Sequence, residues 1–83
     1  MDEDGQIDAL ADEITSYLRA HPNAADTIDG VMKWWLRDIG RTQSMRRVQQ
    51  ALDQLVAQEY LRSQDMAGGG RLYFAGPRLS GRA

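Results

Sequence analysis

One stretch, residues 42–61, constrains the fold of this chain more than any other. Its apolar residues recur at helical spacing, so one face of the predicted helix must be buried. These residues are Val48, Ala51, Leu52, Leu55 and Val56. At about 100° per residue, Arg46 and Gln50 point away from that stripe, while Asp53 falls on one of its flanks. The sequence predicts a helix at residues 44–59 with a core face and an arginine- and glutamine-rich face.

Two further amphipathic segments precede this helix. Residues 6–20 carry an apolar stripe and end before His21 and Pro22, because proline cannot continue a helix. Residues 27–38 form the second predicted helix, with Trp35 on its apolar stripe and Trp34 off it. Gly30 costs that helix about 1 kcal/mol relative to alanine, which predicts a close approach of a neighbouring backbone. Residues 1–5 are an acidic arm that we expect to fray.

The last third of the chain predicts a β-hairpin. Two strand-like segments within residues 61–75 flank a tip with three consecutive glycines, and residues 76–83 are expected to form a flexible tail. We expect Leu72 or Phe74 to close the core from the hairpin. The remaining predicted core residues come from the three helices: Ile14, Leu18, Val31, Met32, Trp35, Val48, Leu52 and Leu55.

Composition bounds the function. The 83 residues suffice for one small domain, and the absence of cysteine excludes disulfides, thiolate zinc sites and cysteine nucleophiles. His21 is the only histidine, and a lone imidazole at a helix end favours a helix-terminal cation over a metal ligand or catalytic base. We therefore predict no enzyme activity, catalytic residue, metal site or cofactor. No apolar run reaches membrane-spanning length and the N-terminus lacks a signal-peptide layout, so we expect a cytoplasmic protein without membrane contact.

The charge is unevenly distributed along the chain. Residues 1–36 carry eight acidic and two basic side chains, whereas residues 37–83 carry eight arginines and four acidic side chains. Arginine favours planar, bidentate contacts, so the second half could meet an anionic partner. A solvated surface with an uneven charge is the alternative interpretation.

Residues 27–31, residues 48–55 and residues 59–61 together resemble the winged helix-turn-helix family, in particular its small stand-alone bacterial proteins. The resemblance covers nearly the whole chain, roughly Ile7 to Ala75, and the predicted winged-helix domain spans residues 6–75. It implies a mainly α fold with a small β-hairpin, in the order α-α-α-β-β, with the hairpin as the wing. Glu59 stands near a position where the family often has glycine, so we expect the third helix to run slightly longer or to end without a left-handed cap.

The same resemblance implies DNA binding and a role as a transcriptional regulator, with helix 44–59 in the major groove and the wing on phosphate. The predicted DNA-binding residues are Arg41, Gln43, Arg46, Arg47, Gln50, Arg62 and Arg71. The alternative is a protein-interaction module of the same fold, with Trp34 as an anchor instead of a rim residue over the core. An uninterrupted basic face would favour double-stranded DNA, and intruding acids from Asp38 and Asp53 would favour a protein partner. A homodimer remains open.

Overall fold

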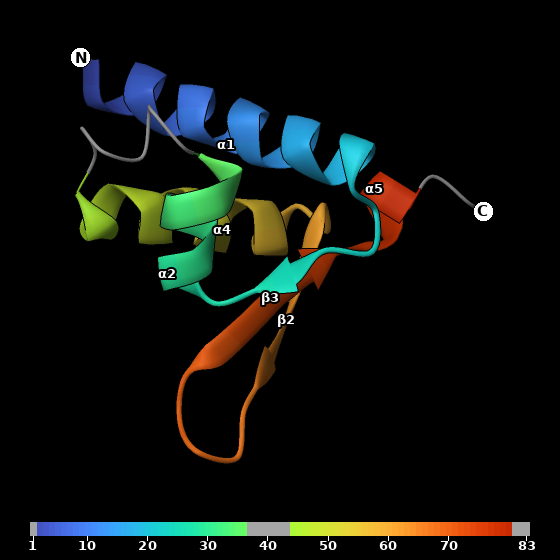
Figure 1. Cartoon of the computed structure of the whole chain (residues 1–83). Helices are drawn as coiled ribbons and strands as arrows, with labels where there is room; N and C mark the ends of the chain where they lie inside the picture. The colour runs from blue at the N-terminus through green and yellow to red at the C-terminus, as the bar shows by residue number, and fades with distance from the viewer. Residues whose placement is uncertain (1, 37–43, 81–83) are drawn as a thin grey trace.

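The computed structural model of the chain describes residues 2–36 and 44–80, which form a mainly helical structure with a small three-stranded antiparallel sheet (Figure 1). Helix α1 (Asp2–Ala20) packs against helix α4 (Met45–Ala57). The elements between them are strand β1 (Ala25–Asp26), helix α2 (Ile28–Gly30) and π-helix η1 (Val31–Trp35). Strands β2 (Leu61–Asp65) and β3 (Arg71–Ala75) and helix α5 (Pro77–Ser80) follow α4.

The three predicted helices are present with shifted boundaries. Helix α1 begins at Asp2, so residues 2–5 are helical and not the frayed arm that we expected. The predicted helix 27–38 is observed as α2 followed directly by η1, up to Trp35, and its last two residues lie outside the described residues. The predicted helix 44–59 is α4, which ends two residues earlier than expected, at Ala57.

The two tryptophans at the end of the π-helical turn η1 differ in exposure. The Val31 N–H donates to Thr27 O at 2.8 Å, whereas the Leu36 N–H reaches five residues back to Val31 O at 3.0 Å. The wider turn lets Trp35 and Leu36, which are neighbours in sequence, both enter the core. Trp34 is 58% exposed and Trp35 is 4% exposed, which confirms the predicted contrast between them.

The sheet has the order β1-β3-β2, with β3 in the centre. Tyr73 of β3 lies opposite Ser63 of β2 and Asp26 of β1, and the β2–β3 register continues without interruption from Leu61 to Asp65. The predicted hairpin at residues 61–75 is therefore confirmed. Strand β1 was not predicted, because two residues are too short to show alternation and their pairing depends on the distant β3.

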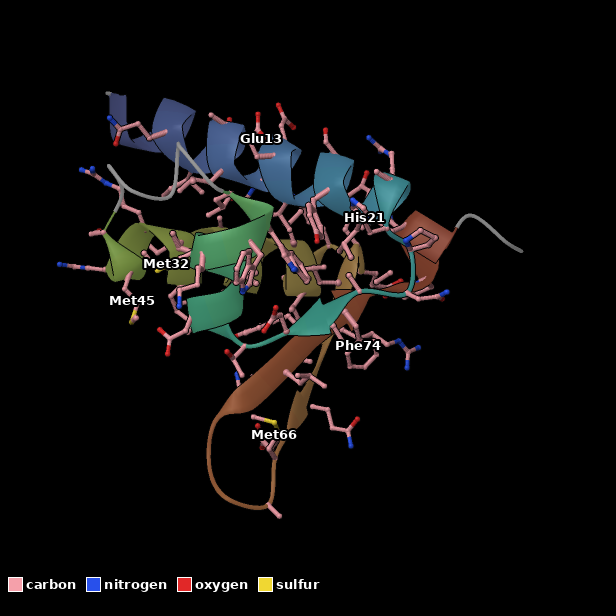
Figure 2. The ribbon with its side chains drawn as sticks, viewed as in Figure 1. Glu13, His21, Met32, Met45, Met66 and Phe74 are labelled. Carbon is pink, nitrogen blue, oxygen red and sulfur yellow. The ribbon has the colours of Figure 1, made fainter. Side chains whose placement is uncertain are left out.

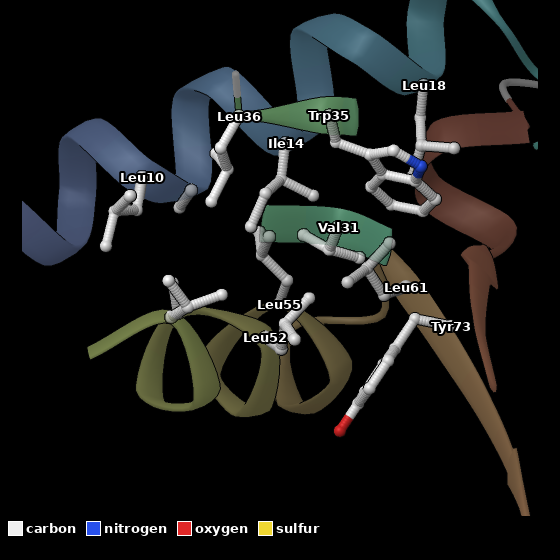
Figure 3. Close-up of a cluster of buried hydrophobic side chains, with 13 residues drawn as sticks. Leu10, Ile14, Leu18, Val31, Trp35, Leu36, Leu52, Leu55, Leu61 and Tyr73 are labelled. Atoms are coloured by element: carbon white, nitrogen blue, oxygen red, sulfur yellow. The ribbon is translucent and has the colours of Figure 1, made fainter. Parts of the chain in front are cut away.

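The core lies between α1, η1, α4 and the sheet (Figure 3). It contains every predicted helical residue except Met32, which is partly buried at its edge. Our prediction for the hairpin was wrong: the buried residue of β3 is Tyr73, while Leu72 and Phe74 alternate to the other face of the sheet and are half-buried. Leu10, Ala11, Leu36, Ala51 and Leu61 complete the buried set.

Gly30 is required by a side chain and not, as we expected, by a neighbouring backbone. A Cβ atom at this buried position would collide with the Asp26 carboxylate. The same carboxylate accepts the Thr27 N–H at 3.0 Å, and Thr27 Oγ1 caps the helix by accepting the Gly30 N–H at 3.4 Å. The start of α2 is thus built around the space that glycine leaves.

Helix α4 ends in a left-handed cap at Glu59, which has φ 67°. The Tyr60 N–H donates to Leu55 O at 2.9 Å and the Glu59 N–H to Val56 O at 3.0 Å, the bond pattern of a Schellman motif. Our expectation of a longer helix or a missing left-handed cap was wrong, because Glu59 adopts the conformation usually given to glycine.

The residues after β3 fold back onto this cap. The Gly76 N–H donates to Tyr60 O at 2.8 Å and the Arg78 N–H donates to Glu59 O at 3.0 Å. Leu79 packs against the core. Residues 77–80 are helical, which corrects our expectation of a flexible tail for this part of residues 76–83; residues 81–83 lie outside the described residues.

Candidate nucleic-acid interface

Helix α4 is held with one face on the core. Its N-cap is Ser44, whose Oγ accepts the Arg47 N–H at 3.2 Å while its own backbone is extended. Val48, Ala51, Leu52 and Leu55 are buried. This fixes the rotation of the helix about its axis, and with it the set of side chains that face outward.

The N-terminal half of α4 presents a basic and amide-bearing surface. Arg46 and Gln50 are exposed one turn apart, and Arg47 beside them is half-buried. No acidic residue occurs in the first turn. Within residues 2–36 and 44–80, no ion pair or side-chain hydrogen bond occupies the side chains of Arg46, Arg47 or Gln50. These three predicted residues are brought together and remain available to a ligand.

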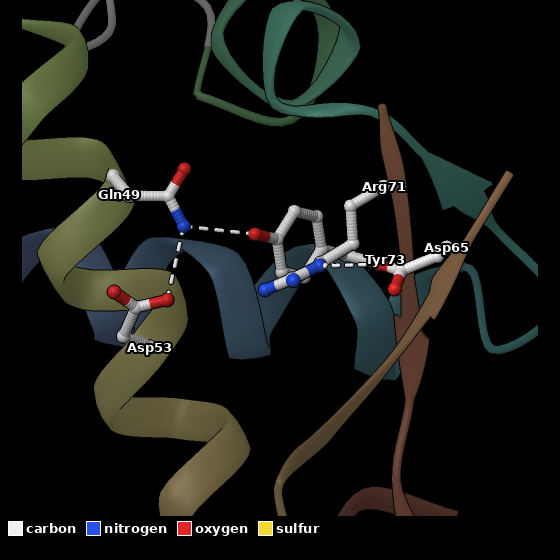
Figure 4. A network of polar contacts seen from close by, with 5 residues as sticks. All are labelled: Gln49, Asp53, Asp65, Arg71 and Tyr73. Carbon is white, nitrogen blue, oxygen red and sulfur yellow. Dashed lines mark hydrogen bonds and ion pairs between the residues drawn. The ribbon is translucent and has the colours of Figure 1, made fainter. Parts of the chain in front are cut away.

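The next turn of α4 is used internally. Gln49 Nε2 donates to Asp53 Oδ1 at 2.9 Å and to the Tyr73 hydroxyl at 2.8 Å (Figure 4). The amide thus links α4 to the centre of the sheet, where the Tyr73 ring is buried. Sequence reasoning did not single out Gln49, although a glutamine four residues before an aspartate is a recognised helical pair.

On the hairpin the two predicted arginines differ. Arg71 Nε lies 2.9 Å from Asp65 Oδ1, with both side chains largely exposed. The hydrogen bond that Arg71 donates to Asp65 and the negative charge of that carboxylate raise the pKa of Arg71, so the positive charge of Arg71 is partly compensated. Arg62 is exposed on the other face of the hairpin, opposite Phe74, and makes no ion pair within the described residues.

A hollow of about 850 Å³ lies between α4, the hairpin and the start of α2. Its charged lining consists of Asp29, Asp53, Asp65 and Arg71. Arg62 lines a different hollow, together with Val56 and Glu59 near the C-terminal end of α4. The structure therefore does not gather the predicted arginines into one continuous basic face.

The other predicted positions lie apart from this surface or outside the described residues. Arg41, Gln43 and Asp38 fall in the undescribed segment 37–43. Trp34 is exposed on η1, with the Lys33 ammonium 6.0 Å from its ring centroid. Figure 2 shows Met45, which is half-exposed, projecting from the first turn of α4.

His21 lies just after the C-terminal end of α1, and its ring is tilted by 33° against that of Tyr17, with ring centroids 4.4 Å apart. Across residues 2–36 and 44–80, no three histidine, cysteine or acidic residues are grouped to hold a metal ion. In the same residues, no helix has both the length and the hydropathy required to cross a bilayer.

Comparisons of the chain with protein families, curated proteins and solved structures found no match.

Proposed function

We propose that the chain is a winged-helix protein that binds double-stranded DNA through the N-terminal half of α4. The element order supports this assignment, because a short β1 precedes α2 and the β2–β3 hairpin follows α4 directly. The observation that carries the proposal is the exposed pair Arg46 and Gln50 at the start of α4. Recognition helices contact base edges with their N-terminal residues.

The chemistry of this pair suits the major groove. An arginine can donate two hydrogen bonds to guanine O6 and N7, and a glutamine can pair with adenine N6 and N7. Because the side chains are one turn apart on one face, they would contact neighbouring base pairs. Arg47, on the flank of that face, is suited to phosphate. Gln49 is assigned no base contact, because its amide nitrogen is bonded to Asp53 and Tyr73.

The salt dependence of binding follows from the available cations. Arg46, Arg47 and Arg62 are free of ion pairs within the described residues, whereas Arg71 is held by Asp65. Neutralising about three phosphates gives a slope of log affinity against log salt of roughly −2.7. Releasing Arg71 from Asp65 on binding would steepen this slope towards roughly −3.6.

The test is a fluorescence anisotropy titration with a mixed-sequence duplex over a range of salt concentrations. Arg46→Ala should weaken binding and relax preference at one base pair, whereas Arg62→Ala should weaken binding to all sequences and flatten the slope by about one. Arg19→Ala is the matched control, because Arg19 is equally exposed but lies on the last turn of α1. Absence of salt-sensitive binding to any duplex at low ionic strength and high micromolar protein would rule out the proposal.

A protein-interaction module is the second candidate, and two observations favour it. Asp53 and Asp65 interrupt the positive charge around α4 and the hairpin, which is the feature that we expected of a protein-binding surface. Trp34 also offers a large exposed aromatic surface, a common anchor in protein interfaces. Under this candidate, the alanine substitutions at Arg46 and Arg62 would change no DNA titration, and Trp34→Ala would weaken binding to the protein partner.

A further inference from the structure

Strand β2 is an edge of the sheet. The order β1-β3-β2 leaves one side of β2 without a neighbouring strand. An unpaired strand edge presents a row of N–H and C=O groups that can pair with another extended chain. Proteins usually protect such an edge with charged side chains, proline or a bulge. β2 has no proline and no bulge in its register with β3, and its two exposed charges are Arg62 and Asp65, of opposite sign.

The backbone groups that face outward can be identified from the hydrogen bonds at the two ends of the hairpin. The Gly76 N–H donates to Tyr60 O at 2.8 Å, and the Met66 N–H donates to Gly70 O at 3.1 Å. Because hydrogen-bonded positions alternate along an antiparallel pair, Arg62 and Gln64 also bond to β3. The N–H and C=O groups of Leu61, Ser63 and Asp65 therefore point away from β3, towards the open edge.

The open edge borders a hollow that can receive side chains. This hollow has a volume of about 380 Å³, and its lining includes Val56, Leu61, Ser63 and Pro77. Within residues 2–36 and 44–80, no other element forms a hydrogen bond with the outward backbone groups of Ser63 or Asp65. The edge thus offers both free hydrogen-bonding groups and space beside them.

We propose that β2 pairs antiparallel with β2 of a second copy of this chain, with the two-fold axis at Ser63. Leu61, Ser63 and Asp65 are placed symmetrically about Ser63, so each outward N–H would lie opposite an outward C=O of the second copy. In this register Asp65 of each copy lies opposite Leu61 of the other, on the face of the sheet away from Arg62. The self-complementarity of the edge is therefore that of its backbone groups.

This register also accounts for an exposed apolar side chain. Met66 is 38% exposed at the end of β2, and Tyr60 is half-buried at its start. With the axis at Ser63, Met66 of each copy lies opposite Tyr60 of the other, and a thioether packs favourably on an aromatic ring. Arg62 lies opposite Gln64, a neutral hydrogen-bond acceptor. Moving the axis to Arg62 would instead place two arginines face to face, which is unfavourable.

Amide hydrogen exchange on the unmodified protein tests the pairing directly. The Ser63 and Asp65 amides should exchange rapidly in the monomer and become protected as concentration rises, by at least about tenfold between ~10 µM and ~1 mM. The Arg62 and Gln64 amides, which bond to β3 in both states, are internal controls and should not change. If the Ser63 and Asp65 amides show no concentration dependence, the proposal is overturned.

Two substitutions locate the interface. Ser63→Pro removes an outward N–H without removing a bond to β3, so it should raise the dimer dissociation constant at least tenfold in sedimentation equilibrium. Ser16→Ala, on the exposed surface of α1, should leave that constant unchanged. Because the chain has no cysteine, Ser63→Cys should form a disulfide-linked dimer on oxidation, and Gln50→Cys on exposed α4 should not. If Ser63→Pro leaves the dimer dissociation constant unchanged and Ser63→Cys gives no cross-link, β2 is not the dimer interface. None of these measurements uses DNA, so they fail or succeed independently of DNA binding.

Discussion

Gly30 and Asp26 form a pair whose coupling can be worked out from the structure. Gly30 has ordinary helical angles, φ −67° and ψ −37°, so alanine fits its backbone conformation. By helix propensity alone, Gly30→Ala should stabilise the protein by about 1 kcal/mol. The Asp26 carboxylate occupies the position of the new methyl group, however, and must move. Whether Gly30→Ala stabilises or destabilises the protein therefore depends on the side chain at position 26.

The magnitude follows from two costs. Forcing an atom into this packed position costs about 1–3 kcal/mol, and moving the carboxylate also sacrifices its bond to the Thr27 N–H, worth about 1 kcal/mol. After the helix-propensity gain, Gly30→Ala should cost about 1–3 kcal/mol net. In an Asp26→Ala background the three nearest colliding atoms are gone, so the same change should stabilise by up to about 1 kcal/mol. The coupling is then about 2–4 kcal/mol.

Urea unfolding of the four proteins, followed by circular dichroism, measures this double-mutant cycle. In a domain of this size each kcal/mol shifts the thermal midpoint by roughly 4–8 °C, so the reversal of sign is also visible by heating. The reasoning is refuted if Gly30→Ala has the same effect with Asp26 as with alanine at that position. Such additivity would mean that the carboxylate moves away without cost.

Three further outcomes test other parts of the structure. Leu52 is fully buried, so Leu52→Ala should reduce the free energy of unfolding by about 2–5 kcal/mol. A thermal unfolding midpoint within a few degrees of wild type would contradict the placement of Leu52 in the core. Glu59→Gly should stabilise by about 0.5–1 kcal/mol in urea titrations, because glycine adopts a positive φ without strain, and a loss of stability would contradict the left-handed cap. Acrylamide should quench Trp34 strongly in a Trp35→Phe variant and Trp35 weakly in a Trp34→Phe variant; equal strong quenching would refute their assigned exposures.

The sequence was sufficient for features that depend on local periodicity. The spacing of Val48, Leu52 and Leu55 identified the buried face of α4, and the glycine-rich tip between two strand-like segments identified the hairpin. Features that depend on distant pairing were not predictable. β1 exists because β3 pairs with it, and the choice of Tyr73 over Phe74 for the core depends on the register of that pairing. Short segments such as β1 carry no periodic signal of their own.

In the candidate site, too, local periodicity was predictable from the sequence and contacts with distant residues were not. A helical wheel identifies which side chains of α4 lie off the core, but it does not reveal which of them other elements engage. The amide of Gln49 donates one hydrogen bond to Tyr73, a residue 24 positions away in sequence, and a second one to Asp53. Arg71 is compensated by Asp65 across the hairpin.

What remains for a ligand on α4 is its first two turns, where Arg46 and Gln50 carry no acid between them. If DNA contacts only these two turns, fewer arginines take part than the sequence predicted. We therefore expect a single copy to bind weakly and with little sequence preference, because few phosphates are neutralised and few bases are read. A two-fold symmetric dimer would double the phosphate contacts and the base contacts if its two α4 helices face one duplex. Whether Ser63→Pro lowers DNA affinity would decide this point, because that substitution leaves α4 unchanged and removes only the pairing edge of β2. An unchanged affinity would show that one copy is the binding unit.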